Sequence, residues 1–157
     1  MKKIVAVNKA ANTTDIALLT ARIGIAALML THGIPKIVML FSQAPVQFPP
    51  VMGMSIELSL ALAVFAEVFC SVFVLVGLAT RLAVIPLAVT MLVAIFLIHA
   101  ADPISVKEPA IHYLLVYLIL LLAGSGKYSI DYLLQSKRTT DSRKRTKVKD
   151  LDLAIYQ

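Results

Sequence analysis

The sequence contains one cysteine, Cys70, and this scarcity excludes several kinds of chemistry. A single cysteine forms neither an internal disulfide nor a CxxC redox pair. Because Cys70 lies inside an apolar stretch, we interpret it as a small, polarizable core residue. A nucleotide site is also not expected, since Gly124-Ser-Gly-Lys127 lacks the spacing and the preceding strand of a phosphate-binding loop.

Charged residues are scarce as well. They make up 15% of the 157 residues, against 59% hydrophobic residues, and the mean hydropathy is +0.86. A soluble domain averages roughly 45–50% apolar residues. The excess lies in four blocks: Ile16–Leu30, Ile56–Ala79, Leu82–Ile98 and Ala110–Ala123. Each block is near the length that crosses a hydrocarbon core of roughly 30 Å at about 1.5 Å per residue.

Four helices that are apolar on every side cannot all be buried in so small a globule, whereas a bilayer surrounds them. The sequence therefore predicts an all-α, polytopic membrane protein with a four-transmembrane-helix bundle. We expect one domain over residues 1–134, with helices at about 14–33, 56–79, 82–99 and 109–124. The first block carries Arg22 and no clean A-x-A site, so we expect a retained helix and no cleaved signal peptide.

Positive charge is distributed unevenly around these blocks, which indicates orientation. If the N-terminus lies inside, twelve of the 15 basic residues lie inside: Lys2, Lys3, Lys9, Arg81, Lys127, Lys137, Arg138, Arg143, Lys144, Arg145, Lys147 and Lys149. This bias predicts that both termini are cytoplasmic. We expect residues 135–157 to form a basic, largely disordered cytoplasmic tail, or to contact anionic lipid headgroups. Nucleic-acid binding is not expected, because no folded module presents the charges.

Two charged residues, Arg22 and Glu67, lie inside the apolar blocks. A charge at the bilayer centre costs at least about 2.5–3.5 kcal/mol, so each needs a partner or a wet cavity. We expect Arg22 and Glu67 to form an intramembrane pair between neighbouring helices. Such a pair either fixes the register of the bundle or lines a polar cavity for a substrate or a proton.

The first helix carries a polar stripe, and the length of the stripe depends on whether the helix continues through Pro35. If the helix continues beyond Pro35, one face carries five residues at steps of three or four: Arg22, Ile25, Met29, His32 and Lys36. That face should then point into the bundle. The alternative is that residues 34–41 lie at the outer membrane interface.

The three histidines are expected at the same, outer end of the bundle. His32 closes the first helix, His99 closes the third and His112 opens the fourth. An outer-side polar cluster is therefore predicted, comprising His32, Lys36, His99, Glu108 and His112. It could bind a quinone headgroup, shuttle protons or hold a metal, although no tight histidine spacing supports a metal site. The alternative is that interfacial histidines only hydrogen-bond neighbouring loops.

Several short motifs together resemble a known family. They are Arg22-x-Gly24, His32-Gly33-x-x-Lys36, Phe48-Pro, Glu67, Gly77-Leu-x-Thr-Arg81, Glu108 and Gly124-x-Gly126-x-x-Ser129-Ile-Asp131. From about Thr14 to Asp131 the chain resembles the DoxX family of small four-helix inner-membrane proteins. The motif positions that carry over are Arg22, His32, Lys36, Glu67, Arg81 and Glu108.

The resemblance implies a bacterial inner-membrane location and a link to redox chemistry. Some relatives are membrane subunits of thiosulfate:quinone oxidoreductase, and others join membrane oxidoreductase complexes in oxidative-stress defence. The lack of a cysteine pair argues against a disulfide-relay function. If the chain is part of an enzyme, the resemblance implies a subunit of a quinone-linked oxidoreductase, with quinone as the candidate cofactor.

Our leading hypothesis is a redox-associated membrane subunit with a polar pocket between the first, second and fourth helices. Quinone or a small acid would bind there, with Arg22 and Lys36 as anion-binding groups. The expected partners are the lipid bilayer, a soluble or membrane oxidoreductase and a second copy of the chain. One alternative is a non-catalytic anchor or assembly partner, which predicts a tight Arg22–Glu67 pair and no pocket. Another is a small oligomeric transporter, which predicts a polar path across the whole membrane.

Overall fold

The computed structural model describes residues 11–42 and 45–137. All regular elements in this part of the chain are helices. They are α1 (Ala11–Phe41), α2 (Ile56–Val64), η1 (Phe65–Cys70), α3 (Ser71–Val76), α4 (Thr80–Val93), η2 (Ala94–Ile98) and α5 (Ile104–Ala123). The segments η1 and η2 are π-helical turns inside longer helices.

Four continuous helices are long and apolar enough to cross a membrane. They span Thr13–Phe41, Ile56–Val76, Thr80–Ile98 and Ile104–Ala123. The second comprises α2, η1 and α3, and the third comprises α4 and η2. The predicted four-helix transmembrane fold is thereby confirmed.

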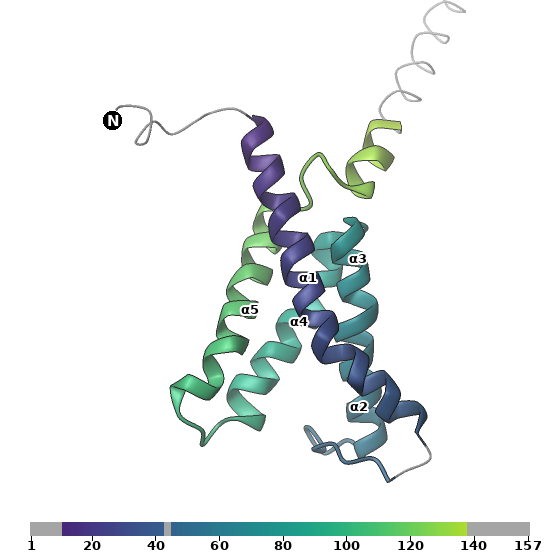
Figure 1. Cartoon of the computed structure of the whole chain (residues 1–157), viewed down its shortest axis with the longest axis vertical. Helices are drawn as coiled ribbons and strands as arrows, with labels where there is room; N and C mark the ends of the chain where they lie inside the picture. Colours follow the sequence, from purple (N-terminus) through teal and green to yellow (C-terminus); the bar gives the residue numbers. More distant parts are fainter. Residues whose placement is uncertain (1–10, 43–44, 138–157) are drawn as a thin grey trace, which may run out of the picture.

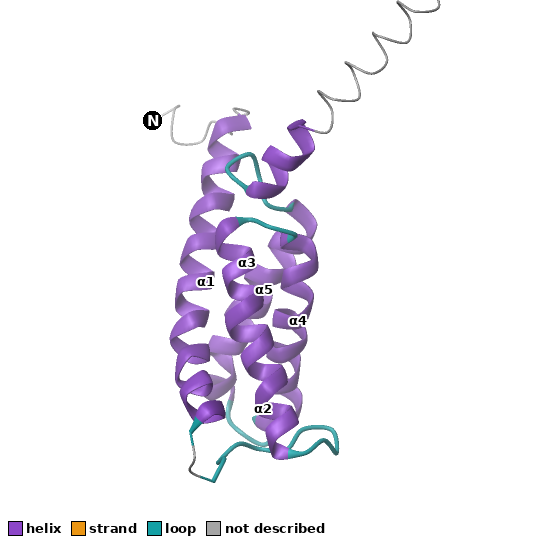
Figure 2. Cartoon of the chain, turned by 90° about the vertical axis from the view of Figure 1, so that its right-hand side faces the viewer, coloured by secondary structure: helices purple, strands orange, loops and turns teal. Residues whose placement is uncertain are grey.

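The helices run up and down, so the connections alternate between two ends of the bundle (Figure 1). We call the end with the start of α1 and the end of α5 the terminal end. The opposite end, with the connections over residues 42–55 and 99–103, is the loop end. Figure 2 shows the helices packed side by side into an elongated bundle. Lys2, Lys3, Lys9 and residues 138–157, which contribute to the predicted orientation and tail, lie outside the described residues.

Helix α1 continues through Pro35 to Phe41, which decides between the two alternatives for this segment. Proline removes one helical N–H, but membrane helices accommodate it because groups on neighbouring helices can satisfy the freed carbonyl. The polar face therefore extends beyond His32. As a result, Lys36 lies on the same helix as Arg22 and reaches the loop end of the bundle.

Helix ends follow local chemistry, and two of the bounds differ from expectation. Ser55 caps α2, since its side chain accepts a hydrogen bond from Leu58 N at 3.2 Å. Gly77 ends α3 with φ +71° and Gly124 ends α5 with φ +82°. Helix α5 begins at Ile104 and not near Pro109. Pro103 precedes the first helical residue in an extended conformation, and Pro109 lies inside the helix, where it removes one backbone N–H. Beyond α5, residues 130–137 are helical, past the predicted domain boundary at 134.

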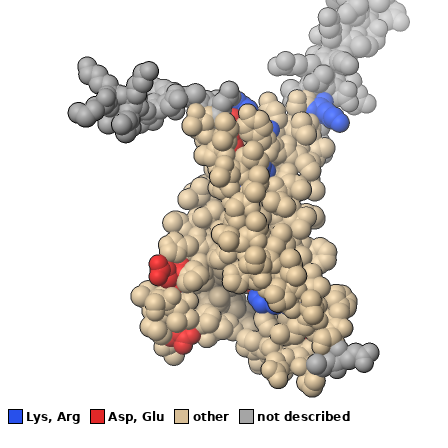
Figure 3. Space-filling model, in the orientation of Figure 1, with Lys and Arg blue, Asp and Glu red and all other residues tan. Residues whose placement is uncertain are grey.

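The centre of the bundle is apolar. Fully buried side chains of this core include Ala26, Val74, Val84, Leu87 and Leu120. Cys70 also lies in this core, as a buried free thiol. Large apolar side chains cover the outside as well, and Figure 3 shows charged side chains toward the two ends of the visible face with an uncharged band between them. A surface of this kind suits contact with lipid tails.

Candidate functional site

Glu67 lies in the π-helical turn η1, near the middle of the second membrane-spanning helix, Ile56–Val76. Its side chain is only 4% exposed. One carboxylate oxygen, Oε1, forms an ion pair with Lys36 Nζ of α1. The other oxygen, Oε2, has no hydrogen-bond partner among the described residues. Glu67 therefore has one oxygen paired with Lys36 and a second, buried oxygen without a partner among the described residues.

Gly33 explains how Lys36 reaches Glu67. A Cβ atom at this position would lie 2.6 Å from Val68 Cγ2 and 3.1 Å from Glu67 Cβ. Only glycine therefore lets α1 approach η1 this closely. The close approach brings Lys36, three residues further along α1, beside the carboxylate.

The expected pair between Arg22 and Glu67 is not formed. Glu67 pairs with Lys36, and Arg22 lies at the terminal end, where its Nη2 donates to the carbonyl of Tyr128. The prediction failed because it treated the first helix as ending near residue 33. That left Arg22 as the only cation for Glu67, whereas the continued α1 supplies a nearer one in Lys36.

A cavity of about 230 Å³ lies beside the ion pair, and all four membrane-spanning helices contribute to its wall. We call it the histidine cavity. Its polar lining residues are His32, Lys36, Glu67, Thr90, His99 and Tyr113. The His32 and Tyr113 rings pack edge to face with centroids 5.9 Å apart. The cavity thus gathers hydrogen-bonding groups around one buried carboxylate.

A second cavity of about 500 Å³ adjoins the first and is covered by the segment 48–54; we call it the loop cavity. Apolar side chains line most of it, including Phe48, Leu62, Val89 and Val93. Leu62 and Val89 are also about half exposed on the outside of the bundle, so this wall reaches the lipid-facing surface between α2 and α4. The residues common to both cavities are Lys36, Glu67, Thr90, Ala94 and His99. The ion pair therefore stands where a polar and an apolar cavity meet.

Both π-helical turns border these cavities. Glu67 lies within η1, and Ala94 and Ile98 of η2 line the loop cavity. A π-turn inserts an extra residue into a helix and changes the direction of the side chains that follow it, and such turns are frequent at functional sites. Their coincidence at one place supports the loop end as the candidate site.

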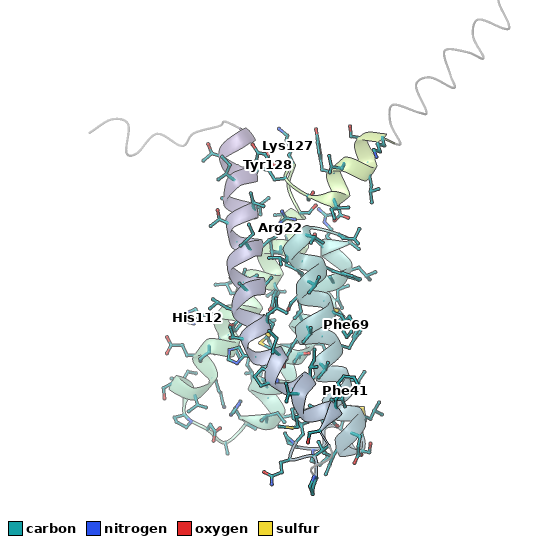
Figure 4. All side chains as sticks on the ribbon, turned by 45° about the vertical axis from the view of Figure 1, so that its right-hand side comes forward. Arg22, Phe41, Phe69, His112, Lys127 and Tyr128 are labelled. Carbon is teal, nitrogen blue, oxygen red and sulfur yellow. The ribbon has the colours of Figure 1, made fainter. Side chains whose placement is uncertain are left out.

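Only part of the predicted outer cluster meets at this site. His32, Lys36 and His99 line the histidine cavity, whereas Glu108 and His112 do not line either cavity and are exposed. Figure 4 shows His112 on the outer side of α5.

The face of α5 that does reach the histidine cavity carries Val106, Pro109, Ala110 and Tyr113. Tyr113 was missed by the sequence analysis. The spacing of Val106, Ala110, Tyr113 and Tyr117 at three or four residues is the signal that could have found it.

At the terminal end, Arg22 is fully buried and links α1 to the segment after α5 through its hydrogen bond to Tyr128; we call this contact the terminal-end clasp. Its guanidinium packs against Gly77 and lies within electrostatic range of Asp131. Asp131 in turn accepts from Ala79 N at 2.7 Å and from Thr80 N at 3.1 Å, which caps α4. Figure 4 shows Arg22 close to the segment that carries Lys127 and Tyr128.

Arg81, the predicted inner-turn residue, also acts on helix ends. Its Nη2 donates to the carbonyl of Leu122 at 3.0 Å, near the end of α5. Lys127 pairs with Asp15 of α1 at 3.4 Å. Asp15, Arg81 and Lys127 line an open cavity of about 600 Å³, and each of these three side chains has a protein partner. We therefore assign the terminal-end charges to holding α1, α4 and α5 together.

The side chains of the loop-end site are able to form hydrogen bonds and to carry protons. Imidazole, ammonium, hydroxyl and carboxylate groups face the histidine cavity. Among the described residues, no three His, Cys, Asp or Glu side chains are grouped to hold a metal ion. The arrangement suits an uncharged ligand that carries oxygen atoms at one end and a hydrocarbon portion at the other.

Comparison with known proteins agrees with the fold. The family model described as DoxX matches residues 17–100, which is more than half of the 157 residues. No curated protein and no solved structure matches the chain. The match includes Lys36, Glu67 and His99. The chain is thus an integral membrane protein with four transmembrane helices, and it belongs to the DoxX family.

Proposed function

We propose that this protein is a redox-associated membrane subunit that binds a quinone at its loop end. The headgroup would occupy the histidine cavity and the prenyl tail the loop cavity. The observation that carries the proposal is the Lys36–Glu67 pair at the junction of these two cavities. A quinone has the same two-part chemistry, since a polar ring with two oxygens is joined to a long apolar chain.

The chain's side chains fit the headgroup. Lys36, His99 and Tyr113 can donate hydrogen bonds to ring oxygens, and the free Oε2 of Glu67 can accept one from a hydroxyl of the quinol. A bound quinone would supply two-electron, two-proton redox chemistry, with a partner oxidoreductase as the source or acceptor of the electrons. The role of the protein would be to orient the ring and exchange its protons.

A small acid, the other ligand considered, is less compatible with the same site. Lys36 is already neutralised by Glu67, and Arg22 lies at the opposite end of the bundle with its partners there. An anion would have to approach the free oxygen of Glu67 in a low-dielectric cavity. Like charges so placed repel strongly, which favours an uncharged ligand.

The two alternative functions fit the structure less well. An anchor without a pocket was expected to pair Arg22 with Glu67, but the two residues have other partners and cavities adjoin Glu67. A transporter needs a polar path through the membrane. Between the two charged clusters the buried side chains of the described bundle are largely apolar, with Val74, Leu87 and Leu120 at its centre.

The proposed binding of the prenyl tail in the loop cavity can be tested with substitutions at two neighbouring positions. Val93 lines the loop cavity, whereas Leu92 faces outward and does not line it. In lipid nanodiscs, Val93→Phe should weaken binding of a long-tailed quinone by about tenfold, equivalent to about 1.4 kcal/mol. The same variant should leave binding of a tail-less benzoquinone within about twofold, and Leu92→Phe should resemble the wild type with both ligands. Absence of saturable quinone binding by the wild type would refute the proposal.

We also propose that the terminal end faces the cytoplasm of a bacterial cell and the loop end faces outward across the inner membrane. The excess of basic residues at the ends of the chain and in the Gly77–Arg81 turn supports this orientation. A membrane-impermeant maleimide applied to intact spheroplasts should label Gln47→Cys but not Lys137→Cys. Both positions are exposed, and Cys70→Ala removes the native thiol. The opposite labelling pattern would reverse the assignment.

A further inference from the structure

His99 and Asp102 form a pair at the edge of the histidine cavity. His99 Nδ1 and Asp102 Oδ2 are 2.7 Å apart. His99 lines both cavities, and its side chain is 36% exposed, while that of Asp102 is 45% exposed. The imidazole therefore borders the ligand site on one side and the loop-end surface on the other.

The turn that carries this pair is held by several hydrogen bonds. His99 N donates to Ala94 O at 2.9 Å, closing the π-helical turn η2, and Asp102 N donates to His99 O at 3.0 Å. Lys107 Nζ of α5 donates to Ala100 O at 2.8 Å. With Nδ1 bonded to a carboxylate, the ring orientation is set and Nε2 is the nitrogen left for a ligand.

We propose that His99 is the proton-exchange group of the ligand site, that Asp102 positions its ring, and that the protons pass to and from water at the loop end. This inference rests on the proposed quinone site. If a quinone is bound, its reduction would use two electrons from the partner oxidoreductase, and protonated His99 would give its Nε2 proton to one ring oxygen. The neutral His99 would then take up a proton from loop-end water and deliver it to the other ring oxygen. Oxidation runs in the reverse direction.

The surroundings favour His99 over the other candidates. His32 packs against the Tyr113 ring, and no carboxylate partner of His32 is found among the described residues. Toward the terminal end, Val84, Leu87 and Leu120 are fully buried and offer no proton acceptor. The titratable or charged groups that surround His99 are Asp102 on its own loop, His32 and Lys36 from α1, Glu67 from η1, and Lys107 and Tyr113 from α5.

Binding as a function of pH tests the inference. We would measure the dissociation constant of a tail-less benzoquinone in nanodiscs between about pH 5.5 and 8.5, the range in which imidazole titrates. In the wild type it should rise by about tenfold with pH, because protonated His99 donates a charge-assisted hydrogen bond. His99→Gln should bind with a flat profile. Asp102→Asn should reduce the amplitude of the profile, since the amide no longer holds the ring with Nε2 toward the ligand site.

The controls separate this inference from the quinone site itself. His112→Gln, on the outer side of α5, should keep the wild-type profile. Saturable binding with an unchanged pH profile in His99→Gln would overturn the role of His99 while leaving the quinone site intact. No saturable binding at any pH in the wild type would overturn both. In vesicles buffered differently on the two sides, the dissociation constant should follow the pH at the loop end, and dependence on the terminal-end pH would overturn the proposed direction.

Discussion

The Lys36→Met variant should lose about 3 kcal/mol of folding free energy, the lower end of what breaking a buried ion pair costs. The loss comes less from the missing attraction than from Glu67, which is 4% exposed and would be left without its cation. Arg22 cannot replace Lys36, because its guanidinium is held at the terminal end by the Tyr128 carbonyl. Denaturant titration of the purified protein in mild detergent measures this difference.

A double-mutant cycle shows whether the loss belongs to the pair. Lys36→Met combined with Glu67→Gln removes both charges, so most of the stability should return. Lys107→Met is the matched control. Lys107 also lies at the loop end, where its Nζ donates to the Ala100 carbonyl, a neutral backbone group, and its replacement should change stability by roughly 1 kcal/mol or less. Equal losses in Lys36→Met and Lys107→Met would contradict the assignment of the pair as a buried interaction.

Ligand binding should behave differently from stability in the same set of variants. The double variant restores the fold but lacks both the ammonium and the carboxylate at the junction of the two cavities. Its affinity for a tail-less benzoquinone should therefore fall by at least about tenfold, the loss expected for one or two hydrogen bonds. Recovery of wild-type affinity together with wild-type stability would show that the pair is purely structural.

The four-helix fold was predictable from the sequence because it depends on few variables. Block length and hydropathy decide whether a segment spans a membrane, and the four blocks stand clearly apart from their polar connections. Local cap chemistry at Ser55 and Gly77 was also readable, because each acts within a few residues of itself.

The partners of the buried charges were harder to predict. The choice between Arg22 and Lys36 for Glu67 depends on whether α1 continues past Pro35, and a proline is compatible with either outcome. Arg22 donates to the backbone carbonyl of Tyr128, and because every residue has such a carbonyl, the sequence does not indicate which one accepts. Neither π-helical turn has a sequence signature, so the direction of Glu67 could not be derived.

The inward face of α5 was equally ambiguous. This helix is apolar almost all round, so periodicity does not distinguish the lipid side from the core side. The choice of His112 over Tyr113 followed from the chemistry of imidazole, whereas packing against α1 and η2 decides which residue faces the cavity. One residue along a helix is a rotation of about 100°, which is enough to exchange a cavity position for a lipid-facing one.

The second large effect is expected at the opposite end of the bundle, at Gly77. This residue has φ +71°, and an added Cβ would overlap Arg22 Nη1 and lie 2.6 Å from Ser129 Cβ. Gly77→Ala should therefore lose about 2–4 kcal/mol, because left-handed strain of roughly 1–2 kcal/mol adds to overpacking of similar size. Displacing the guanidinium also breaks its hydrogen bond to Tyr128 and separates α1 from the cap of α4.

Substitutions at two other glycines separate backbone strain from overpacking as causes of the expected loss. Gly53 has φ +76° with no atom within 4 Å of an added Cβ, so Gly53→Ala should show the strain alone. Gly24 lies in α1 with the same open space and no positive φ, and Gly24→Ala should be neutral or slightly stabilising. If denaturant titration shows that Gly77→Ala loses no more unfolding free energy than Gly53→Ala, the close packing of Arg22 against Gly77 is contradicted. Because the loop-end cavities lie at the far end of the bundle, Gly77→Ala protein that remains folded should still bind quinone with wild-type affinity, which marks the terminal-end clasp as structural.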